Sequence, residues 1–338
     1  MTAVLISGSI AYDTVCRLEG RFENLILPRD IAHLNLTFLA SSMTRSFGGC
    51  APNIAWSLKA LGGEPVILSA VGRDGEEYLQ HLRRAGIDTS SIGVFGDEWT
   101  SQVFITTDSG GNQLATFVPG AMQRAHEVAL PAGLKSMLVH IAPGGLEAMR
   151  QLAARCREDS VPYVFDPGQA TSQLEAGDLR EIESGACLTC LSEYEAALLE
   201  KRLGISLEKK ASQEGRRYLV TYGAGGCAML RPEGKLSIPA VPAKIASGTV
   251  GAGDAFRGGL LFGMTRGLSD PECLKLGALM SAFRLEGSGA QGWRPSQQEI
   301  RERYGQAWGE PFPVPPEGGR PRCETAGVLL SARPPGRR

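Results

Sequence analysis

The stretch Ser247-Gly-Thr-Val-Gly-Ala-Gly-Asp-Ala-Phe-Arg-Gly-Gly259 places a carboxylate directly after a glycine-rich turn. Because Gly251 and Gly253 have no Cβ, the backbone can bend tightly there and bring its N–H groups close to an anion. Apolar residues then recur at helical intervals from Ala252 to Arg266, which predicts a buried helix whose N-terminal amides face that anion. Asp254 lies in the first turn, where it can either cap the helix or accept a proton from a bound hydroxyl.

The composition of the chain favours a globular protein that acts on small molecules. With 338 residues, 43% of them hydrophobic, the chain is long enough for one large or two small domains with a sizeable core. Its 35 basic and 36 acidic residues nearly cancel, so no global field attracts nucleic acid or an anionic membrane. No apolar run approaches the roughly 20 residues of a membrane span, and no basic segment precedes the first apolar residues. The expected location is cytoplasmic.

Strand and helix patterns alternate along most of the chain. Strands are expected at Val4–Ser7, Val66–Ala70, Met137–Ile141, Tyr163–Phe165, Leu188–Leu191, Tyr218–Thr221, Cys227–Arg231 and Leu236–Ile238. Helices are expected at Gly48–Leu61, Glu76–Ala85, Leu146–Glu158, Glu193–Arg202, Ala252–Arg266, Pro271–Glu286 and Gln297–Trp308. Such alternation predicts a mostly parallel sheet with helices on both faces, a three-layer α/β/α core.

Two segments interrupt this alternation. Residues 14–47 show no sustained period, although Leu36–Leu39 could be a strand, and so long a connection suggests a small protruding subdomain. Later, Ser101–Thr107 and Gln113–Val118 flank Asp108-Ser-Gly-Gly-Asn112, which is typical of a hairpin. One antiparallel sheet built from about residues 14–47 and 99–120 is therefore expected. The tail of residues 310–338 is rich in Pro, Gly and Arg, and we expect it to be disordered or loosely docked.

Two motifs together resemble the ribokinase-like (PfkB) family of carbohydrate and nucleoside kinases. They are Phe47-Gly-Gly-Cys-Ala-Pro-Asn53 and Gly251-Ala-Gly-Asp-Ala-Phe256, and their order and separation make the pair specific. The resemblance implies a ribokinase-like α/β domain over residues 1–309, with the antiparallel sheet as a lid. Within the family the chain is most similar to bacterial adenosine kinase-like proteins, through Gly8-Ser-Ile-Ala-Tyr-Asp13, Pro119-Gly-Ala-Met122 and Phe165-Asp-Pro-Gly-Gln169.

This resemblance implies a phosphotransferase that uses ATP and Mg²⁺ to phosphorylate the 5′-hydroxyl of a purine nucleoside. Adenosine is the first expected acceptor, and inosine or guanosine are possible. Asp254 matches the family's catalytic base, which accepts the proton of the attacking hydroxyl. Gly251, Ala252 and Gly253 match its anion hole, whose amides stabilise charge on the transferring phosphate.

The resemblance also implies the groups that bind the two substrates. Asp13 matches an acid at the end of the first strand that holds sugar hydroxyls, and a carboxylate can accept from two vicinal hydroxyls. The other acceptor residues it implies are Gly48, Gly49 and Asn53. Without the resemblance, a strand-end turn residue is the preferred interpretation for Asp13 and a helix cap for Asn53.

On the nucleotide side, the resemblance implies phosphate contacts from Thr221, Gly223 and Gly226, in the turn Thr221-Tyr-Gly-Ala-Gly-Gly226. An ordinary hairpin turn is the competing interpretation. Glu195 matches an acid that acts on hydrated Mg²⁺ through water, and a solvated helix glutamate is the alternative. Asp166 is a carboxylate at the end of a strand on the same side, and it is a weaker candidate than Glu195 for this role.

The chain departs from the family pattern at three places. One is Gly289-Ala-Gln-Gly-Trp293, which stands where adenosine kinase-like relatives tend to have Asn-His after the Gln. The metal-side motif usually reads Asn-x-x-Glu, but here it reads Ser192-Glu-Tyr-Glu195. Many relatives carry an acid, associated in some members with a monovalent cation, where this chain has Gly248-Thr-Val250, so activation by potassium is not predicted. Two alternatives stay open: a sugar kinase acting on ribose or fructose within the same fold, and a catalytically silent ligand-binding protein, which the departures at Ser192 and Gly248 suggest. The expected partners are small molecules and ATP, with neither nucleic acid nor membrane, and the expected state is a monomer or homodimer.

Overall fold

A nine-stranded sheet forms the centre of the computed structural model, which describes residues 2–26, 35–245 and 248–314. The strand order is β13-β12-β11-β10-β9-β8-β1-β4-β5. From β5 to β11 neighbouring strands are parallel, and β12 and β13 complete the sheet as antiparallel strands. The bounds are β1 Val4–Ser7, β4 Pro65–Gly72, β5 Ile92–Phe95, β8 Leu138–Ile141, β9 Tyr163–Phe165, β10 Leu188–Ser192, β11 Tyr218–Thr221, β12 Cys227–Arg231 and β13 Gly234–Ile238.

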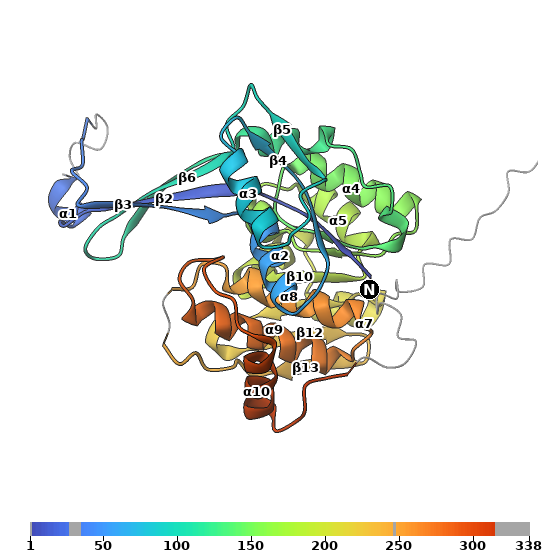
Figure 1. Ribbon diagram of the computed structural model, residues 1–338. Helices are drawn as coiled ribbons and strands as arrows, with labels where there is room; N and C mark the ends of the chain where they lie inside the picture. The colour runs from blue at the N-terminus through green and yellow to red at the C-terminus, as the bar shows by residue number, and fades with distance from the viewer. Residues whose placement is uncertain (1, 27–34, 246–247, 315–338) are drawn as a thin grey trace, which may run out of the picture.

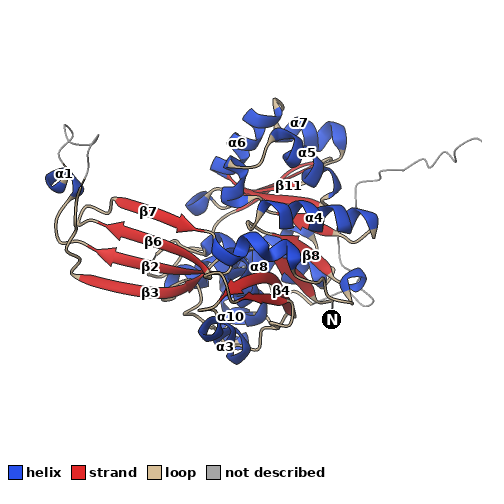
Figure 2. Cartoon of the chain, turned by 90° about the horizontal axis from the view of Figure 1, so that it is seen from above, coloured by secondary structure: helices blue, strands red, loops and turns tan. Residues whose placement is uncertain are grey.

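Helices cover both faces of this sheet, as Figures 1 and 2 show. Since side chains alternate across a strand, Val4 and Ile6 of β1 pack into one core layer and Leu5 into the other. The layer around Val4 contains α2 Cys50–Ala60, α3 Glu76–Arg84, α8 Ala252–Thr265, α9 Asp270–Glu286 and α10 Gln297–Trp308. The layer around Leu5 contains α4 Leu146–Glu158, α5 Ala176–Gly185, α6 Glu193–Leu203 and α7 Leu207–Glu214.

A second, four-stranded sheet projects from the body, with the short helix α1 (Phe22–Leu25) at its far end (Figure 2). Its order is β3-β2-β6-β7, formed by β2 Ala11–Arg17, β3 Ser42–Gly48, β6 Ser101–Thr107 and β7 Gln113–Val118. β2 pairs with β3 antiparallel and with β6 parallel, and β6 forms the expected hairpin with β7. Only residues 8–10 separate β1 of the main sheet from β2, so the two sheets are joined directly. We call this second sheet the lid.

Glycines allow α8 to pack closely against its neighbours. A Cβ at Gly258 would lie 2.4 Å from Cβ of Ser57 in α2, and one at Gly259 would lie 2.6 Å from the carbonyl oxygen of Leu276 in α9. Ser57 also donates a hydrogen bond of 2.8 Å to the carbonyl oxygen of Ala255. The N-terminus of α8 is therefore held in place from two sides.

Most expected elements appear within a residue or two of their predicted bounds, and three expectations need correction. Leu36–Leu39 is not a strand, because the second lid strand, β3, begins only at Ser42. The predictions missed β2, β3, β5, α1, α5 and α7. Short 3-10 helices at Gly120–Glu127, Leu134–Ser136, Gly168–Ser172 and Gly223–Gly225 were also not predicted. Among the described residues, no helix is long and apolar enough to span a bilayer. Of the tail expected to be disordered, residues 315–338 lie outside the described part.

Candidate active site

The first turn of α8 has the geometry of an anion-binding site. Gly251 precedes the helix with a φ of +80°, a conformation that favours glycine because it has no Cβ. The amides that follow belong to Ala252, exposed Gly253 and Asp254, and the first N–H groups of a helix have no partner within the helix. Together with the positive end of the helix dipole, they favour a phosphate group at this turn.

Asp254 does not serve as a helix cap. Oδ2 of its carboxylate accepts a hydrogen bond of 2.8 Å from Nδ2 of Asn53 in α2. Burial raises the pKa of Asp254 to about 7; the Asn53 hydrogen bond opposes this rise, and the nearby charge of Asp166 adds to it. A carboxylate whose pKa lies near neutral pH is well suited to accept a proton from a hydroxyl.

Asn53 belongs to a buried hydrogen-bond network. Its Oδ1 accepts from Nε2 of Gln291 at 2.9 Å, and the same nitrogen donates to the Tyr78 hydroxyl at 2.7 Å. Tyr78 in turn donates to the carbonyl oxygen of Gly48 at 2.5 Å. The network links the Gly48 turn to Asp254 and shows that Asn53 does not cap α2, whose N-cap is Gly49.

The predicted acceptor residues Asp13, Gly48 and Gly49 lie together where the lid meets the core. Gly49 has a φ of +91°, and a Cβ at Gly48 would lie only 2.3 Å from Oδ2 of Asp13. The expected position of Asp13 at the end of the first strand is wrong: it lies within β2, between Ser46 of β3 and Val103 of β6. Burial raises its pKa to about 6.

A cavity of about 680 Å³ lies on the other side of the α8 turn. Thr221, Gly223 and Gly226, the residues expected to contact the nucleotide, line it together with Ala252 and Gly253. The segment that contains them is also the turn between antiparallel β11 and β12. It is therefore a hairpin turn, and this is compatible with phosphate binding. The remaining lining is mostly apolar: Ala224, Ala240, Val241, Pro242, Ala243, Thr249, Phe256, Ala278, Ser281, Ala282 and Leu285. We call it the donor cavity.

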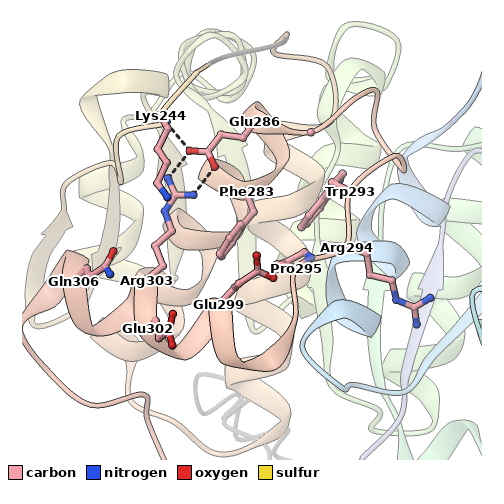
Figure 3. Close-up of a pocket in the computed structure, with 11 residues that line it drawn as sticks. Lys244, Phe283, Glu286, Trp293, Arg294, Pro295, Glu299, Glu302, Arg303 and Gln306 are labelled. Carbon is pink, nitrogen blue, oxygen red and sulfur yellow. Dashed lines mark hydrogen bonds and ion pairs between the residues drawn. The ribbon is translucent and has the colours of Figure 1, made fainter.

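Charged side chains fasten one wall of the donor cavity to α9 (Figure 3). The Arg303 guanidinium pairs with both carboxylate oxygens of Glu286 at 2.6 Å. Arg303 also donates to the carbonyl oxygen of Pro242 at 2.9 Å, and Glu286 accepts from the backbone N–H of Lys244 at 2.5 Å. Arg303 and Glu286 lie side by side in the hollow drawn in Figure 3, which Arg294, Glu299 and Glu302 also line.

A second cavity, of about 400 Å³, lies beneath the lid. It is lined by Phe117 of β7, by Met122, and by residues that follow β8 and β9, including Gly144 and Gln169. Gly144 lies against Gly8, which follows β1, so this cavity opens at the carboxyl edge of the main sheet. We call it the acceptor cavity. By contrast, Phe38 packs against Phe22 near the lid's far end, with ring centroids 5.6 Å apart.

The residues expected on the metal side have structural partners. Ser192 and Glu195 form a capping box at the start of α6, in which Glu195 accepts from the Ser192 N–H at 2.7 Å. Asp166 pairs with Arg257 through contacts of 3.0 and 3.4 Å, and lies 3.5 Å from Nε2 of buried His140. Burial would raise the pKa of Asp166, but Arg257 and His140 hold it below its usual value. Among the described residues, no three His, Cys, Asp or Glu side chains converge as metal ligands.

Sequence reasoning missed three residues of this site and noted a fourth, Gln291, only as part of a segment that departs from the family pattern. Arg257 lies one helical turn after Asp254, so its spacing could have revealed it. Tyr78 and Arg284 reach the site only through tertiary packing, and nothing local to their segments marked their roles.

Comparison with known proteins yields consistent similarities. The model of the pfkB family of carbohydrate kinases matches residues 4–297. A nucleoside kinase of Methanocaldococcus jannaschii is 28% identical over 271 residues, covering 80% of this chain and 89% of that protein. A ribokinase of Lactococcus lactis is 26% identical over 315 residues, covering 90% and 97%. The structure of Burkholderia thailandensis nucleoside kinase in complex with inosine superposes with a TM-score of 0.81 at 35% identity, covering 91% of this chain and 99% of that one.

Proposed function

Since the chain belongs to the pfkB family of carbohydrate kinases and is therefore a phosphotransferase with a hydroxyl acceptor, we propose that it transfers the γ-phosphate of ATP to the 5′-hydroxyl of a purine nucleoside. The observation that carries this proposal is the position of Asp254. Its carboxylate lies in the anion-binding turn of α8 and is linked through Asn53 to the Gly48 turn beside Asp13. One hydrogen-bond network thus connects the proposed base and phosphate site with the proposed sugar site.

The chain's own residues divide the work of the reaction. Asp13 and the Gly48–Gly49 turn would hold the ribose hydroxyls and direct the 5′-hydroxyl towards Asp254, which accepts its proton as the oxygen attacks phosphorus. The amides of Gly251, Ala252 and Gly253 would stabilise the charge that spreads over the transferring phosphoryl oxygens. The donor cavity would hold the nucleotide, with Thr221, Gly223 and Gly226 near its phosphates.

Mg²⁺ fits this arrangement as an ion bound mainly to phosphate oxygens and water. The charges of Asp166 and Glu195 both act on Arg257, so the two carboxylates lie around the same region. Such acids can accept hydrogen bonds from the ion's water ligands, which suits a cation that gives up its hydration reluctantly. When bound, the ion would neutralise charge on the phosphates.

The acceptor cavity favours a nucleoside over a free sugar. Phe117 and Met122 offer apolar surface to a flat base, and the carboxamides of Gln123 and Gln169 offer both donors and acceptors to its polar edge. A free ribose or fructose would leave these groups without a partner. Adenosine is the first acceptor that we propose, and inosine is supported by the inosine complex of the B. thailandensis enzyme.

The test is ADP release from MgATP with adenosine, inosine, guanosine, ribose and fructose supplied separately. Turnover on a purine nucleoside is the expected result. The control is Asp254→Asn, which keeps the side-chain shape but cannot accept the proton, and should lower kcat by at least about 10²-fold. Turnover confined to ribose or fructose would indicate a sugar kinase, whereas ligand binding without any turnover would indicate a silent binding protein.

A further inference from the structure

Arg284 places a buried guanidinium behind the anion-binding turn. It extends from the last turn of α9 and is only 2% exposed. Its Nη1 donates to the carbonyl oxygen of Gly287 at 3.1 Å, while its Nε has no hydrogen-bond partner among the described residues. A Cβ built on Gly251 would lie 3.5 Å from that Nε. The unpartnered Nε therefore lies beside the turn that begins α8.

The charge of Arg284 is not balanced in the way that nearby charges are. Arg257 pairs with both carboxylate oxygens of Asp166. Within the described part of the chain, Arg284 has no carboxylate at ion-pair distance. The negative charge of Asp254 favours the protonated form of Arg284 from farther away. An arginine stays protonated even when buried, and a buried charge without a counter-ion is costly. An anion at the α8 turn would supply the missing countercharge.

We propose that Arg284 is a positioning residue for phosphoryl transfer, because it holds the Gly251 turn in place. It also supplies a fixed positive charge from within the chain, in the place of an exchangeable monovalent cation. This inference rests on the proposed function. Negative charge spreads over the phosphoryl oxygens as the group is transferred, and a charge already in position stabilises it without reorganisation. The built-in cation also agrees with the absence of an acid in Gly248-Thr-Val250.

A purely structural role predicts different behaviour. A basic side chain in the last turn of a helix stabilises it by hydrogen bonding to the final carbonyl groups, as Arg284 does with Gly287. Loss of that role alone would lower the melting temperature but leave kcat unchanged well below it. Neither guanidinium ion nor potassium would then affect the rate.

The experiment compares wild type, Arg284→Lys and Arg284→Ala, with Lys275→Ala as a matched loss of a charge from α9. Rates are measured in potassium and in tetramethylammonium buffers of equal ionic strength, with and without millimolar guanidinium chloride. We expect the wild type to be indifferent to the choice of cation. Arg284→Ala should lose about 10-fold or more in kcat, which is less than the roughly 10²–10³-fold typical of a donor that contacts the transition state, because Arg284 lies behind the turn; the change in KM for ATP should be smaller. Guanidinium or potassium should restore part of that rate, Arg284→Lys should be intermediate, and Lys275→Ala should match the wild type.

Two results would overturn the proposal: strong dependence of the wild type on potassium, or a kcat of Arg284→Ala equal to that of the wild type. Binding of a non-hydrolysable ATP analogue and of ADP, measured by calorimetry in tetramethylammonium buffer, separates this proposal from the proposed function. Arg284→Ala should weaken the binding of the triphosphate more than that of ADP. If no acceptor is phosphorylated but this difference is present, the proposed function fails and the role of Arg284 stands. If the wild type turns over and the variant matches it in both assays, only the role of Arg284 fails.

Discussion

Asn53 donates a hydrogen bond of 2.8 Å to Asp254, although the two residues are 201 positions apart in the sequence. The bond joins α2, which follows the Gly48–Gly49 turn, to α8, which begins after Gly251. A hydrogen bond to a carboxylate favours its charged form, whereas burial favours the neutral form. The pKa of Asp254, raised to about 7, therefore reflects a balance that Asn53 partly controls.

Replacing Asn53 by Ala should shift the pH dependence of the rate. Because the proposed base must be deprotonated, kcat/KM of the wild type should fall below about pH 7. Loss of a hydrogen bond to a charged group, worth roughly 1.5–3 kcal/mol at most, should raise the pKa of Asp254 and move that fall upwards by about one pH unit. Rates between pH 5.5 and 9 test this, with exposed Gln298→Ala as the control. An unmoved profile would contradict the assignment of the base.

Asp254 should lower the stability of the free protein at alkaline pH. The pKa of Asp254 is raised in the folded state, so the folded protein binds this proton more tightly than the unfolded chain does. The stability that comes from binding the proton is lost as pH rises through about 7. Asp254→Asn should therefore melt at a higher temperature than the wild type at pH 8, and its advantage should shrink towards pH 5. Thermal unfolding without nucleotide measures this. The same difference at both pH values would show that the carboxylate is not perturbed by burial.

Adding one methyl group at Gly48 should disturb the acceptor site alone. The new Cβ would lie 2.3 Å from Oδ2 of Asp13, so that carboxylate must move. Misplacement of a substrate-holding group by about 1 Å can cost as much as 10²-fold, so Gly48→Ala should lower kcat/KM for the nucleoside by about 10–100-fold. KM for ATP should change little. Gly96→Ala, where a Cβ meets nothing within 4 Å, is the control.

Gly258→Ala should destabilise the fold. The added Cβ would lie 2.4 Å from that of Ser57, and overpacking of this kind typically costs about 1–3 kcal/mol. Gly177→Ala in α5 meets nothing within 4 Å, and should be neutral or stabilising by up to about 1 kcal/mol. Urea unfolding of both variants checks the pair. Equal stabilities would mean that α8 has room to move away from α2.

Glu286→Gln should weaken the binding of ATP while leaving the chemical step intact. The carboxylate holds Arg303, which in turn holds the carbonyl oxygen of Pro242 in the wall of the donor cavity. Without the charge pair that wall should loosen, so KM for ATP should rise several-fold at nearly constant kcat. Steady-state kinetics at varied ATP concentration measure both constants. A fall in kcat with unchanged KM would instead mean that the Glu286–Arg303 pair acts on the chemical step.

The sequence predicted elements well where the periodicity was strong. The bounds of α4, β9, β11, β12 and α10 agree with the expectation because apolar spacing marks them clearly. The lid strand β2 was missed, and Asp13 misplaced with it, because most of that strand is only partly buried and lacks a clear alternation. α7 was missed because it is polar; its buried Lys210 pairs with Glu183 at 2.9 Å and with Glu214 at 3.2 Å.

Among the residues of the site, too, only those in local motifs could be predicted. Glycine turns and the adjacent Asp254 are local motifs and could be read directly from the chain. The hydrogen bonds that Gln291 and Tyr78 make to Asn53 and Gly48 could not, because they exist only once α2, α3 and the segment after α9 have packed together. Arg284 is similar: its closeness to Gly251 is a property of helix packing and of no motif.

The glycine contacts of α8 also bear on how such a kinase can diverge. A side chain at Gly258 or Gly259 would collide with α2 or α9, so natural selection has little freedom to alter the helix that handles phosphate. β7 of the lid is exposed along its whole length, and yet it carries Phe117 into the acceptor cavity. Side-chain changes in β7 should therefore disturb core packing little while they alter the lining of that cavity. If the cavity holds the acceptor as proposed, the choice of acceptor can change without any change in α8.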